Sequence, residues 1–385
     1  MACVAAVAAL PAAGAVEESV DAETGYRVLT VAAGEYAAYS DVLDANVPGI
    51  IKRGTGTAWL TGANSAFVGP IKIEAGVLGG NSGSFGKTGD LHVLSNATLD
   101  VSLLPDGGMA TRKVFFEGDG LAGSGAIICT NGTANRDTMF KNIEMTGDAS
   151  WGGSVRFGMR YGTFTMNGHT LTKSTSGTFS LFQPIASPGA FVMKKGQLLA
   201  QQGATLNGDA SNTITLDGGE LNMWCLYYTS QQIGWTLRTK GSANFLAGGL
   251  HNDRTGYNQY SGPIVIEGTQ LSINMNNTDR KLSITGPITT APGATGKLIK
   301  TGSGEGGATW IMNDAQLGSV SVWAGDLHFV DASVTVSNAY TYVTRATSQR
   351  VPRLTLTNTT WIAHPQASGN MARNVTRTRS RSAAT

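Results

Sequence analysis

The sequence is poor in charged residues, cysteine and long apolar runs, and each shortage excludes a class of protein. Charged residues make up 14% of the chain, against about 25% in an average domain, and long amphipathic helices would need more Glu, Lys, Leu and Arg. The three cysteines form no CxxC pair and no Cys/His cluster, so a cysteine-based zinc site is not supported. After residue 20 no stretch has 18 continuous apolar residues, so that part of the sequence shows no transmembrane helix.

Glycine is the residue that the chain has in excess. It accounts for 51 of the 385 residues, roughly twice the usual share. Apolar residues make up 41%, which is enough for a core and excludes wholesale disorder. A composition rich in Gly, Thr and Asn with few charges indicates an all-β protein.

Charge is distributed unevenly along the chain. The formal net charge is +2, yet no acidic residue follows Asp331. The stretch after it holds seven arginines: Arg345, Arg350, Arg353, Arg373, Arg377, Arg379 and Arg381. A basic end can bind nucleic acid, anionic polysaccharide or an acidic surface. The rest of the chain has 21 basic against 26 acidic residues, which argues against nucleic acid as the main partner. We expect residues 366–385 to be a basic, disordered tail.

Residues 1–15 resemble a secretory signal peptide. An apolar run precedes Pro11, and Ala13-Gly14-Ala15 is typical of the small residues at a cleavage site. The alternative is an apolar first strand. If a leader is removed, Cys129 and Cys225 remain, either paired in an oxidising compartment or as two buried thiols.

A short phrase recurs along the chain: two apolar residues one position apart, a bend, and a third apolar residue. It occurs at Leu29/Val31/Tyr36, Ile71/Ile73/Leu78, Phe164/Met166/Leu171, Phe191/Met193/Leu198, Ile214/Leu216/Leu221, Ile264/Ile266/Leu271, Val320/Val322/Leu327 and Leu354/Leu356/Trp361. Five copies have a glycine two positions before the third residue: Gly34, Gly76, Gly196, Gly219 and Gly325. The alternation predicts a strand on each side of a tight bend, where glycine allows a positive φ.

The spacing of the phrase predicts the fold. Most intervals between successive third residues are near one, two or three units of roughly two dozen residues, although the last, from Leu327 to Trp361, fits poorly. A fixed period of this size indicates a solenoid, and it is too short for the blades of a propeller. We therefore predict a single parallel β-helix of roughly a dozen coils over residues 51–365, with an N-terminal cap and first coil at 16–50. The alternative is a pair of stacked β-sandwiches.

One segment carries a longer pattern. In residues 52–78 the pattern residues are Lys52, Gly54, Gly56, Thr57, Trp59, Leu60, Thr61, Gly62, Asn64, Phe67, Gly69, Ile73, Gly76 and Leu78. The pattern resembles the autotransporter-associated β-strand repeat of bacterial secreted passenger proteins. A looser copy has Lys300, Gly302, Gly304, Thr309, Trp310, Ile311, Asn313, Gly318, Val322, Gly325 and Leu327. The resemblance implies a right-handed single-stranded β-helix, export and a secreted or cell-surface location in bacteria, and it implies no particular enzyme activity or cofactor.

Candidate catalytic groups are few. Gly80-Asn81-Ser82-Gly83-Ser84 is similar to the nucleophile loop of chymotrypsin-like proteases, but no histidine precedes Ser82, and a Gly/Ser corner between coils is the alternative. Asn277-Thr278-Asp279 is similar to the start of the polygalacturonase pattern, whose later motifs are missing. The nearest group of acids is Asp209, Asp217 and Glu220, which a polysaccharide lyase or hydrolase would need on one face. The five histidines, at 92, 169, 251, 328 and 364, are scattered without metal-ligand spacing.

Two stretches interrupt the repeat, at residues 224–235 and 249–262. Their candidate ligand-binding residues are Trp224, Tyr227, Tyr228, Trp235, Asp253, Arg254, Tyr257 and Tyr260. Aromatic rings of this kind stack on sugars, and the alternative is that they pack within the coil. We expect a secreted structural or adhesive β-helix, not an enzyme, that presents loops to glycan or a cell surface. A scaffolding segment of a longer polypeptide is one alternative. A polysaccharide lyase or glycoside hydrolase on the same scaffold is the other.

Overall fold

The computed structural model describes residues 12–132, 135–182, 185–201, 206, 211–224, 231–248, 257–275, 281–302, 308–323, 326–337, 341–343, 353–357, 360–363 and 375–378. The chain forms two compact units, Met1–Val155 and Arg156–Thr385. Among the described residues nearly all regular structure is strand, with one short 3-10 turn, η1, at Leu121–Gly123. No described helix is long and apolar enough to span a membrane.

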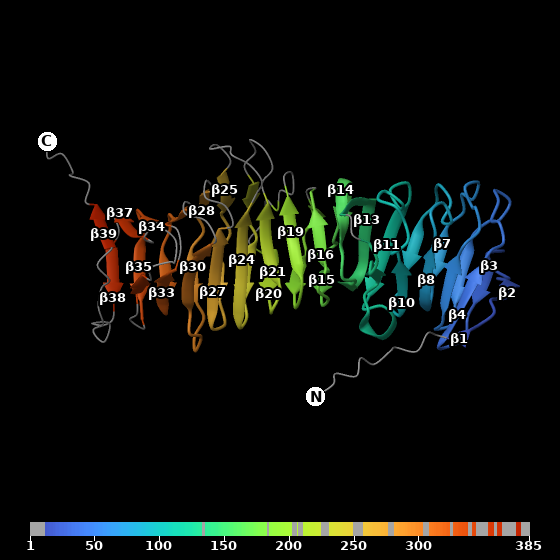
Figure 1. Cartoon of the computed structure of the whole chain (residues 1–385), viewed down its shortest axis with the longest axis horizontal. Helices are drawn as coiled ribbons and strands as arrows, with labels where there is room; N and C mark the ends of the chain where they lie inside the picture. The colour runs from blue at the N-terminus through green and yellow to red at the C-terminus, as the bar shows by residue number, and fades with distance from the viewer. Residues whose placement is uncertain are drawn as a thin grey trace, which may run out of the picture. The chain divides into compact units, whose positions relative to one another are not determined.

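The first unit has two columns of parallel strands (Figure 1). The first column is β3 (Arg27–Thr30), β5 (Ile50–Arg53), β7 (Ile71–Ile73), β9 (Leu91–Val93), β11 (Lys113–Gly118) and β13 (Arg136–Trp151). The second is β1 (Ala12–Ala13), β4 (Glu35–Tyr39), β6 (Thr57–Leu60), β8 (Gly76–Gly80), β10 (Ala97–Asp100) and β12 (Ile127–Ile128). The chain alternates between the columns, so each strand pairs with one from the next coil. One further strand, β2 (Glu17–Val20), pairs antiparallel with β3.

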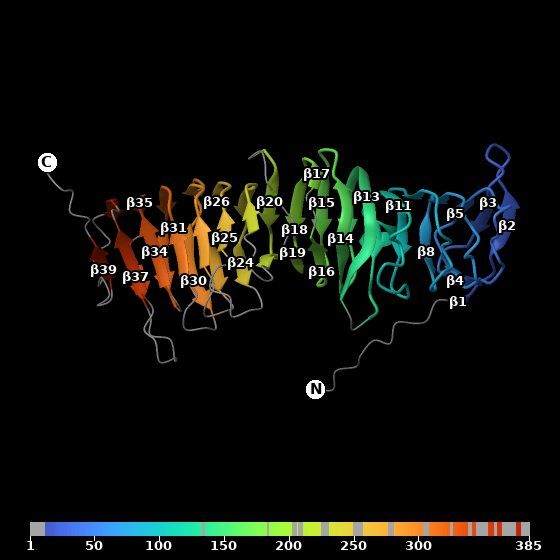
Figure 2. The same cartoon turned by 90° about the horizontal axis from the view of Figure 1, so that it is seen from above.

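The second unit has three such columns (Figure 2). The first is β15 (Thr170–Lys173), β18 (Ala190–Met193), β20 (Thr213–Leu216), β23 (Thr236–Thr239), β26 (Ile264–Ile266), β29 (Ile288–Thr290), β32 (Ala315–Leu317), β35 (Ser333–Val336) and β38 (Thr360–Ala363). The second is β14 (Arg156–Thr165), β16 (Thr178–Leu181), β19 (Gln197–Gln201), β21 (Glu220–Trp224), β24 (Ser242–Gly248), β27 (Gln270–Met275), β30 (Lys297–Gly302), β33 (Ser319–Val322) and β36 (Thr341–Val343). The third is β22 (Gln231–Ile233), β25 (Tyr257–Tyr260), β28 (Lys281–Ile284), β31 (Ala308–Ile311), β34 (Asp326–Val330), β37 (Arg353–Thr357) and β39 (Val375–Thr378). A short strand, β17 (Ile185–Ser187), pairs with β14.

The pairing confirms the predicted parallel β-helix. In each unit the coils stack as a parallel β-solenoid. Arg27 pairs with Ile50, and Ile50 pairs with Ile71, so each pairing joins positions one repeat apart in the sequence. In the second unit Ile264 pairs with Ile288, which is a step of similar length. The repeat seen in the sequence is therefore the length of one coil.

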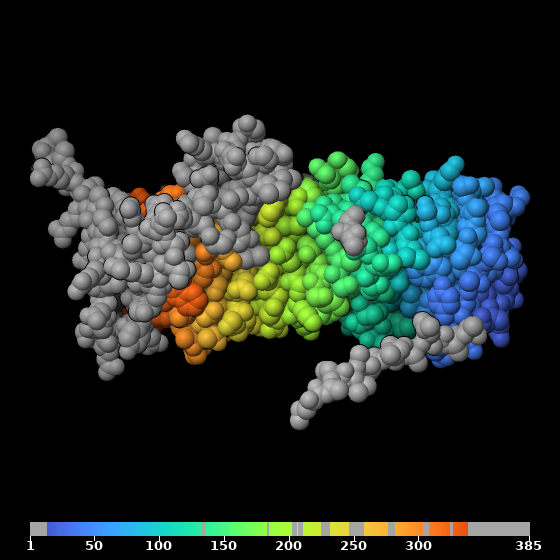
Figure 3. Space-filling view, in the orientation of Figure 1, coloured from blue at the N-terminus to red at the C-terminus, as the bar shows by residue number. Residues whose placement is uncertain are grey.

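Inward side chains form ladders along each column, because alternate residues of a strand point to the same side. One ladder runs through Ile50, Ile71, Leu91 and Val114, each paired with the next. All four side chains are fully buried. Burial of each such side chain contributes roughly 1.5–3 kcal/mol. In Figure 3 successive coils of the first unit lie in direct contact across the face turned to the viewer. The core is a stack of apolar layers, one from each coil.

In the copies whose side-chain burial the structure describes, the repeated phrase marks inward positions except at Tyr36 in the first coil. Tyr36 is 37% exposed, while the next residue, Ala37, is buried and pairs with Ala58. Ala58 in turn pairs with Leu78, which the phrase places correctly inside. The first bend is thus one residue longer than the phrase assumes, which moves the inward position from Tyr36 to Ala37.

The phrase also occurs at more than one corner of the coil, which explains its irregular last interval. The copy that ends at Leu271 runs from β26 to β27, at the corner between the first and second columns. The copy that ends at Leu327 runs from β33 to β34, whereas the copy that ends at Trp361 runs from β37 to β38. The last interval therefore separates different columns, while within one column Trp361 pairs with Val334 of the preceding coil.

Strand pairing extends beyond the predicted boundaries at both ends. Ala12 and Ala13, inside the predicted signal peptide, pair with β4. Val375–Thr378, inside the predicted disordered tail, pairs with Leu354–Thr357 of β37. These segments therefore take part in parallel pairing outside residues 16–365, where the coils were expected.

Candidate functional site

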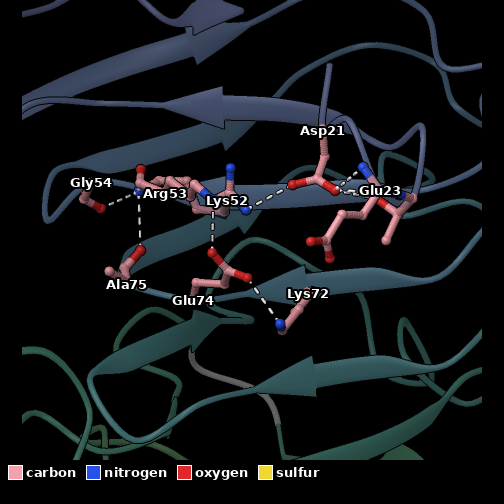
Figure 4. Close-up of polar contacts among 9 residues, drawn as sticks. Asp21, Glu23, Lys52, Arg53, Gly54, Lys72, Glu74 and Ala75 are labelled. Atoms are coloured by element: carbon pink, nitrogen blue, oxygen red, sulfur yellow. Dashed lines mark hydrogen bonds and ion pairs between the residues drawn. The ribbon is translucent and has the colours of Figure 1, made fainter. Parts of the chain in front are cut away.

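The lysine of the repeat pattern lies inside the solenoid. Lys52 is fully buried and occupies an inward position of β5, paired with Leu29 on one side and Ile73 on the other. Its Nζ donates hydrogen bonds to the carbonyl oxygens of Arg53 and Gly54, both at 2.7 Å. A third bond, at 3.1 Å, reaches the carbonyl of Ala75 in the next coil (Figure 4). The ammonium therefore ties the corner of one coil to the corner of the next.

Two further lysines repeat this arrangement. Lys173 and Lys300 are 1% exposed and pair with Met193 and Val322 of the following coil. The Nζ of Lys173 donates to the carbonyl of Thr175 at 2.8 Å and to the hydroxyl of the same residue. The Nζ of Lys300 donates to the carbonyl of Thr301 at 2.7 Å. We call the bends after Lys52, Lys173 and Lys300 the lysine corners.

The corner at Lys173 was missed by the sequence interpretation. Its residues can be aligned without a gap to the copy at Lys52, because a glycine and a threonine follow each lysine at the same distance. These are Gly56 and Thr57 in one copy and Gly177 and Thr178 in the other. A search for lysine followed four residues later by Gly-Thr would have found this corner. The apolar phrase does not find it, because the phrase requires an apolar residue at each inward position.

Burial lowers the pKa of all three lysines. The pKa is about 8 for Lys52, about 7 for Lys173 and about 8 for Lys300. The cause in each case is the loss of hydration of the ammonium group. At Lys300 the charge of Asp326, which is itself buried, opposes this shift. At Lys52 three backbone carbonyl dipoles stabilise the protonated amine.

The glycines of the pattern are required by close approach between coils. A Cβ atom added at Gly56 would lie 2.1 Å from the carbonyl oxygen of Ala32 in the preceding coil. At Gly76, which has a φ of 73°, it would lie 2.4 Å from the carbonyl oxygen of Gly56 and 2.9 Å from the Nζ of Lys52. No side chain fits at either position without displacement of a coil.

The pattern asparagine bridges three coils. Asn64 is fully buried, and its Oδ1 accepts a hydrogen bond of 2.8 Å from the amide of Leu43 in the preceding coil. Its Nδ2 donates to the carbonyl of Ser84 in the following coil at 2.6 Å. Asn64 therefore satisfies backbone groups that would otherwise be buried without partners. Like the lysine and the glycines, it stabilises the stack of coils.

Beside the corner at Lys52, a charged network covers the outer face of the sheet (Figure 4). Arg53 bonds to Glu74 at 2.7 Å and to Asp21 at 3.0 Å. Lys72 lies 2.9 Å from the other carboxylate oxygen of Glu74. Bonds from Thr24 and Arg53 lower the pKa of Asp21 to about 2. These half-exposed charges pair with one another and leave the buried lysine outside their network.

The structure describes three side chains of the predicted ligand surface. For two of them the prediction of an exposed position is wrong. Trp235 is 2% exposed and stacks on Phe191 with ring centroids 5.6 Å apart. Tyr260 is fully buried, donates its hydroxyl to the carbonyl of Trp235 at 2.8 Å, and packs edge-on against Phe245. Trp224, at the end of β21, is half-buried. The rings of Trp235 and Tyr260 belong to the core, where Phe191 and Phe245 pack against them and a carbonyl accepts the Tyr260 hydroxyl.

The other predicted ligand residues cannot be placed by side chain. Tyr227, Tyr228, Asp253 and Arg254 lie outside the described residues, and Tyr257 is described only as part of strand β25. Asn277, Thr278 and Asp279 also lie outside the described part.

The structure describes two of the three acids in the predicted group. Glu220 accepts hydrogen bonds of 3.3 Å from the side-chain amides of Gln197 and Asn244, its neighbours along the column. Asp217 is exposed in the turn before it, and Asp209 lies outside the described residues. Within the described ranges no three His, Cys, Asp or Glu side chains gather as a metal site would need. Glu220 belongs to a ladder of polar side chains, whose amide and carboxylate groups bond from coil to coil.

The remaining candidate residues lie in turns or pack against aromatic rings. Ser82 is exposed in a turn, and Asn81 beside it accepts the indole N–H of Trp59 at 3.0 Å. His92 stacks on Phe115 with centroids 4.6 Å apart, and His328 stacks on Trp310 at 5.1 Å. Burial lowers the pKa of both imidazoles. Cys129 is a buried free thiol, and Cys225 lies outside the described residues.

One corner of the second unit gathers the stretches that interrupt the repeat. Strands β21, β24 and β27 are paired at their ends, with Trp224 opposite Gly248 and Ala247 opposite Met275. The strands that follow, β22, β25 and β28, are paired at their starts. Residues 225–230, 249–256 and 276–280 therefore connect the same two columns in three successive coils. We call these three stretches the corner segments.

Comparison with known proteins adds no assignment. No family model, curated protein or solved structure matches the chain. The similarity to the autotransporter-associated repeat therefore stays a prediction.

Proposed function

We propose that this chain is a secreted or cell-surface β-helix with a structural or adhesive role, in which the corner segments contact a glycan or a neighbouring cell surface. The observation that carries the proposal is the pairing of the strands on both sides of these segments. Paired strands hold the ends of each segment about 4.8 Å from those of the next coil, which is the spacing between neighbouring strands. Tyr227, Tyr228, Asp253 and Arg254 all belong to these segments.

The residue types in the corner segments suit sugar recognition. Aromatic rings pack on the apolar faces of sugars, while carboxylate and guanidinium groups bond to hydroxyls. Loops supported by a rigid scaffold are a common location for binding residues. The proposed bacterial passenger origin rests on the pattern residues, of which Lys52, Gly56, Asn64 and Gly76 stabilise the stack of coils.

The test is a binding screen of the full chain on a glycan array, compared with the variant Tyr227→Ala/Tyr228→Ala. We expect binding to at least one glycan class and at least a tenfold loss in the variant. Tyr161→Ala, which removes an exposed ring from β14, is the matched control and should bind like the unmodified protein. Equal binding by all three proteins, or no binding, would contradict a contact role for the corner segments.

The second candidate, a polysaccharide lyase or hydrolase, is tested on the same samples. Incubation with uronic-acid and neutral polysaccharides should release no product if the role is structural or adhesive. Release of product that is lost in Asp217→Asn or Glu220→Gln would favour the enzyme and contradict our proposal.

A further inference from the structure

An exposed tryptophan lies beside a lysine on the outer face of the second column in the second unit. Trp323 follows directly after β33, where its amide donates to the carbonyl of Lys300 at 2.9 Å, and it is 44% exposed. Lys297 begins β30, and its Nζ lies 5.6 Å from the centroid of the Trp323 ring. The quadrupole of an indole ring attracts a cation at this distance. We call these two side chains the Lys297–Trp323 platform.

The platform joins two successive coils. Ile299 and Ser321 are paired with each other in the sheet, and they lie between Lys297 and Trp323 along their strands. Both point outward by strand alternation, yet they are only 1% and 3% exposed. The lysine stem and the indole ring extend toward each other across this pair and contribute to its burial. The ammonium and the ring are therefore held close together on the outer surface.

The ammonium of Lys297 has no carboxylate partner among the residues that the structure describes. The first unit shows the complete arrangement of the same groups. There the Nζ of Lys113 lies 4.4 Å from the ring centroid of Phe115 and 2.7 Å from a carboxylate oxygen of Glu144. At Lys297 the described residues provide the cation and the ring only. A carboxylate from another molecule would complete the arrangement.

Uncharged polar groups lie next to the platform. Asn274 on β27 pairs with Thr301 on β30, and Trp323 follows one coil further in the same register. The Oδ1 of Asn274 has no hydrogen-bond partner in the described ranges. The last torsion of an asparagine is soft, so rotation of the amide can present this oxygen to a ligand. An amide, a hydroxyl and an exposed indole ring together suit the hydroxyls and the apolar face of a sugar.

We propose that the Lys297–Trp323 platform binds a uronic-acid unit of an acidic polysaccharide. The carboxylate of the sugar contacts Lys297, its ring face packs on Trp323, and its hydroxyls bond to Thr301 and Asn274. A neutral sugar would leave the ammonium without a partner, and an acidic peptide would supply the carboxylate without the sugar ring. The platform and its neighbours lie on β27, β30 and the end of β33. This second binding site therefore goes beyond the contact role proposed for the corner segments.

The test is isothermal titration of the full chain with hexamers of galacturonate, mannuronate and guluronate. We expect at least one hexamer to bind, and binding of none at millimolar concentration would overturn the proposal. The methyl ester of the bound hexamer keeps the sugar rings and loses the charge, whereas a glutamate hexapeptide keeps the charge and has no sugar rings. Each should bind at least about tenfold more weakly, because each lacks one of the two central contacts. Equal binding of the ester or of the peptide would contradict the proposal.

Variants then locate the site on the molecule. Lys297→Met and Trp323→Leu should each weaken binding of the hexamer by at least about tenfold. Lys240→Met removes an exposed charge after β23, and Tyr161→Ala removes an exposed ring from β14. These two controls should bind like the unmodified protein. If the platform variants also bind like the unmodified protein, the proposal is wrong.

The corner segments are tested separately. Tyr227→Ala/Tyr228→Ala should keep full affinity for the uronate hexamer, even if it loses binding to another glycan class. Loss of uronate binding in this variant alone would place the sugar at the corner segments and contradict the platform. Loss in the platform variants alone would support the platform and leave the contact role of the corner segments to its own screen.

A second measurement uses the unmodified fold. In protein labelled with ¹⁵N, the hexamer should shift the indole N–H signal of Trp323, which is identified by its absence in Trp323→Leu. Added salt should reverse the shift, because ions screen a charge contact at the surface. A hexamer that binds without changing this signal would contact another part of the chain and overturn the proposal.

Discussion

At single positions, the pattern residues bring backbone groups of adjacent coils together. Lys52 and Asn64 donate to carbonyls of the next coil, and Gly56 allows a carbonyl of the preceding coil to approach. A parallel solenoid satisfies its backbone within the strands, but the bends between strands need other partners. The pattern is therefore a description of how the bends between strands are stabilised.

Replacement of Asn64 tests this explanation at a buried bend. Asn64→Ala removes two hydrogen bonds and leaves the amide of Leu43 and the carbonyl of Ser84 buried without these partners. We expect the free energy of unfolding to fall by about 2–4 kcal/mol. Asn46→Ala is the control, because Asn46 bonds only within an exposed turn with Asp44 in the described part of the chain, and it should change stability by less than about 0.5 kcal/mol. Urea unfolding measures both; similar losses would contradict the bridging role.

The glycines allow a test that separates steric from conformational effects. Gly56→Ala places a methyl group 2.1 Å from a backbone oxygen, so a coil must move, and we expect a loss of about 2–4 kcal/mol. Gly34 has a φ of 76° and open space around its Cβ position, so Gly34→Ala should cost only about 1 kcal/mol. Thermal unfolding of the two variants under one set of conditions gives the comparison. If Gly34→Ala were the more damaging of the two, close approach between coils would not be the reason for Gly56.

Among the elements, strand β2 is unusual in a parallel stack because it pairs antiparallel with β3. Its four residues are exposed, and Glu17 and Glu18 are among them. In the described part of the chain β2 pairs only with β3, so its other edge carries unpaired backbone groups. Charged side chains on an edge strand oppose pairing with another chain. The acids of β2 would therefore keep this edge from joining a second molecule.

Loss of one of these charges should promote self-association. We expect Glu17→Val to raise the association constant several-fold, because it also adds a β-branched residue to the edge. Glu23→Val removes the same charge from the turn that follows and should leave the association constant unchanged. Sedimentation velocity over a range of concentrations compares them. A monomeric Glu17→Val protein, or association of both variants, would contradict the role of the edge.

The coil architecture could be predicted from the sequence, whereas the corner chemistry could be predicted only in part. Ile71, Ile73 and Leu78 are inward because strand alternation fixes the side on which each residue lies. Tyr36 was misplaced because an additional residue in a bend shifts every position after it. Lys173 was missed because a buried lysine is rare unless its donors are satisfied, and the Thr175 carbonyl that accepts from it becomes visible only once the bend is folded.

The ligand surface was harder to predict for a physical reason. Trp235 and Tyr260 are amphipathic rings, which serve equally well on a surface and in a core where a carbonyl accepts the polar group. The carbonyl of Trp235 accepts the Tyr260 hydroxyl, and the two residues come together because they are about one coil apart in the sequence. Sequence alone does not show which aromatic residues have such an acceptor.

At the scale of the whole molecule, the buried ladders and the lysine corners both depend on parallel coils that stay in register. Arg238 on β23 and Val265 on β26 are paired outward residues of adjacent coils, and Thr289 on β29 lies one coil further. Neighbouring parallel strands are about 4.8 Å apart, which is within the range of a disulfide, whereas two strand spacings are not.

The decisive measurement is disulfide formation in a background where the three native cysteines are replaced by alanine. Arg238→Cys/Val265→Cys should oxidise readily within one molecule, as shown by a loss of two hydrogens in the mass and of both free thiols. Arg238→Cys/Thr289→Cys should stay reduced under the same conditions. Failure of the first pair to form a bond, or equal oxidation of both pairs, would contradict the stacked parallel coils.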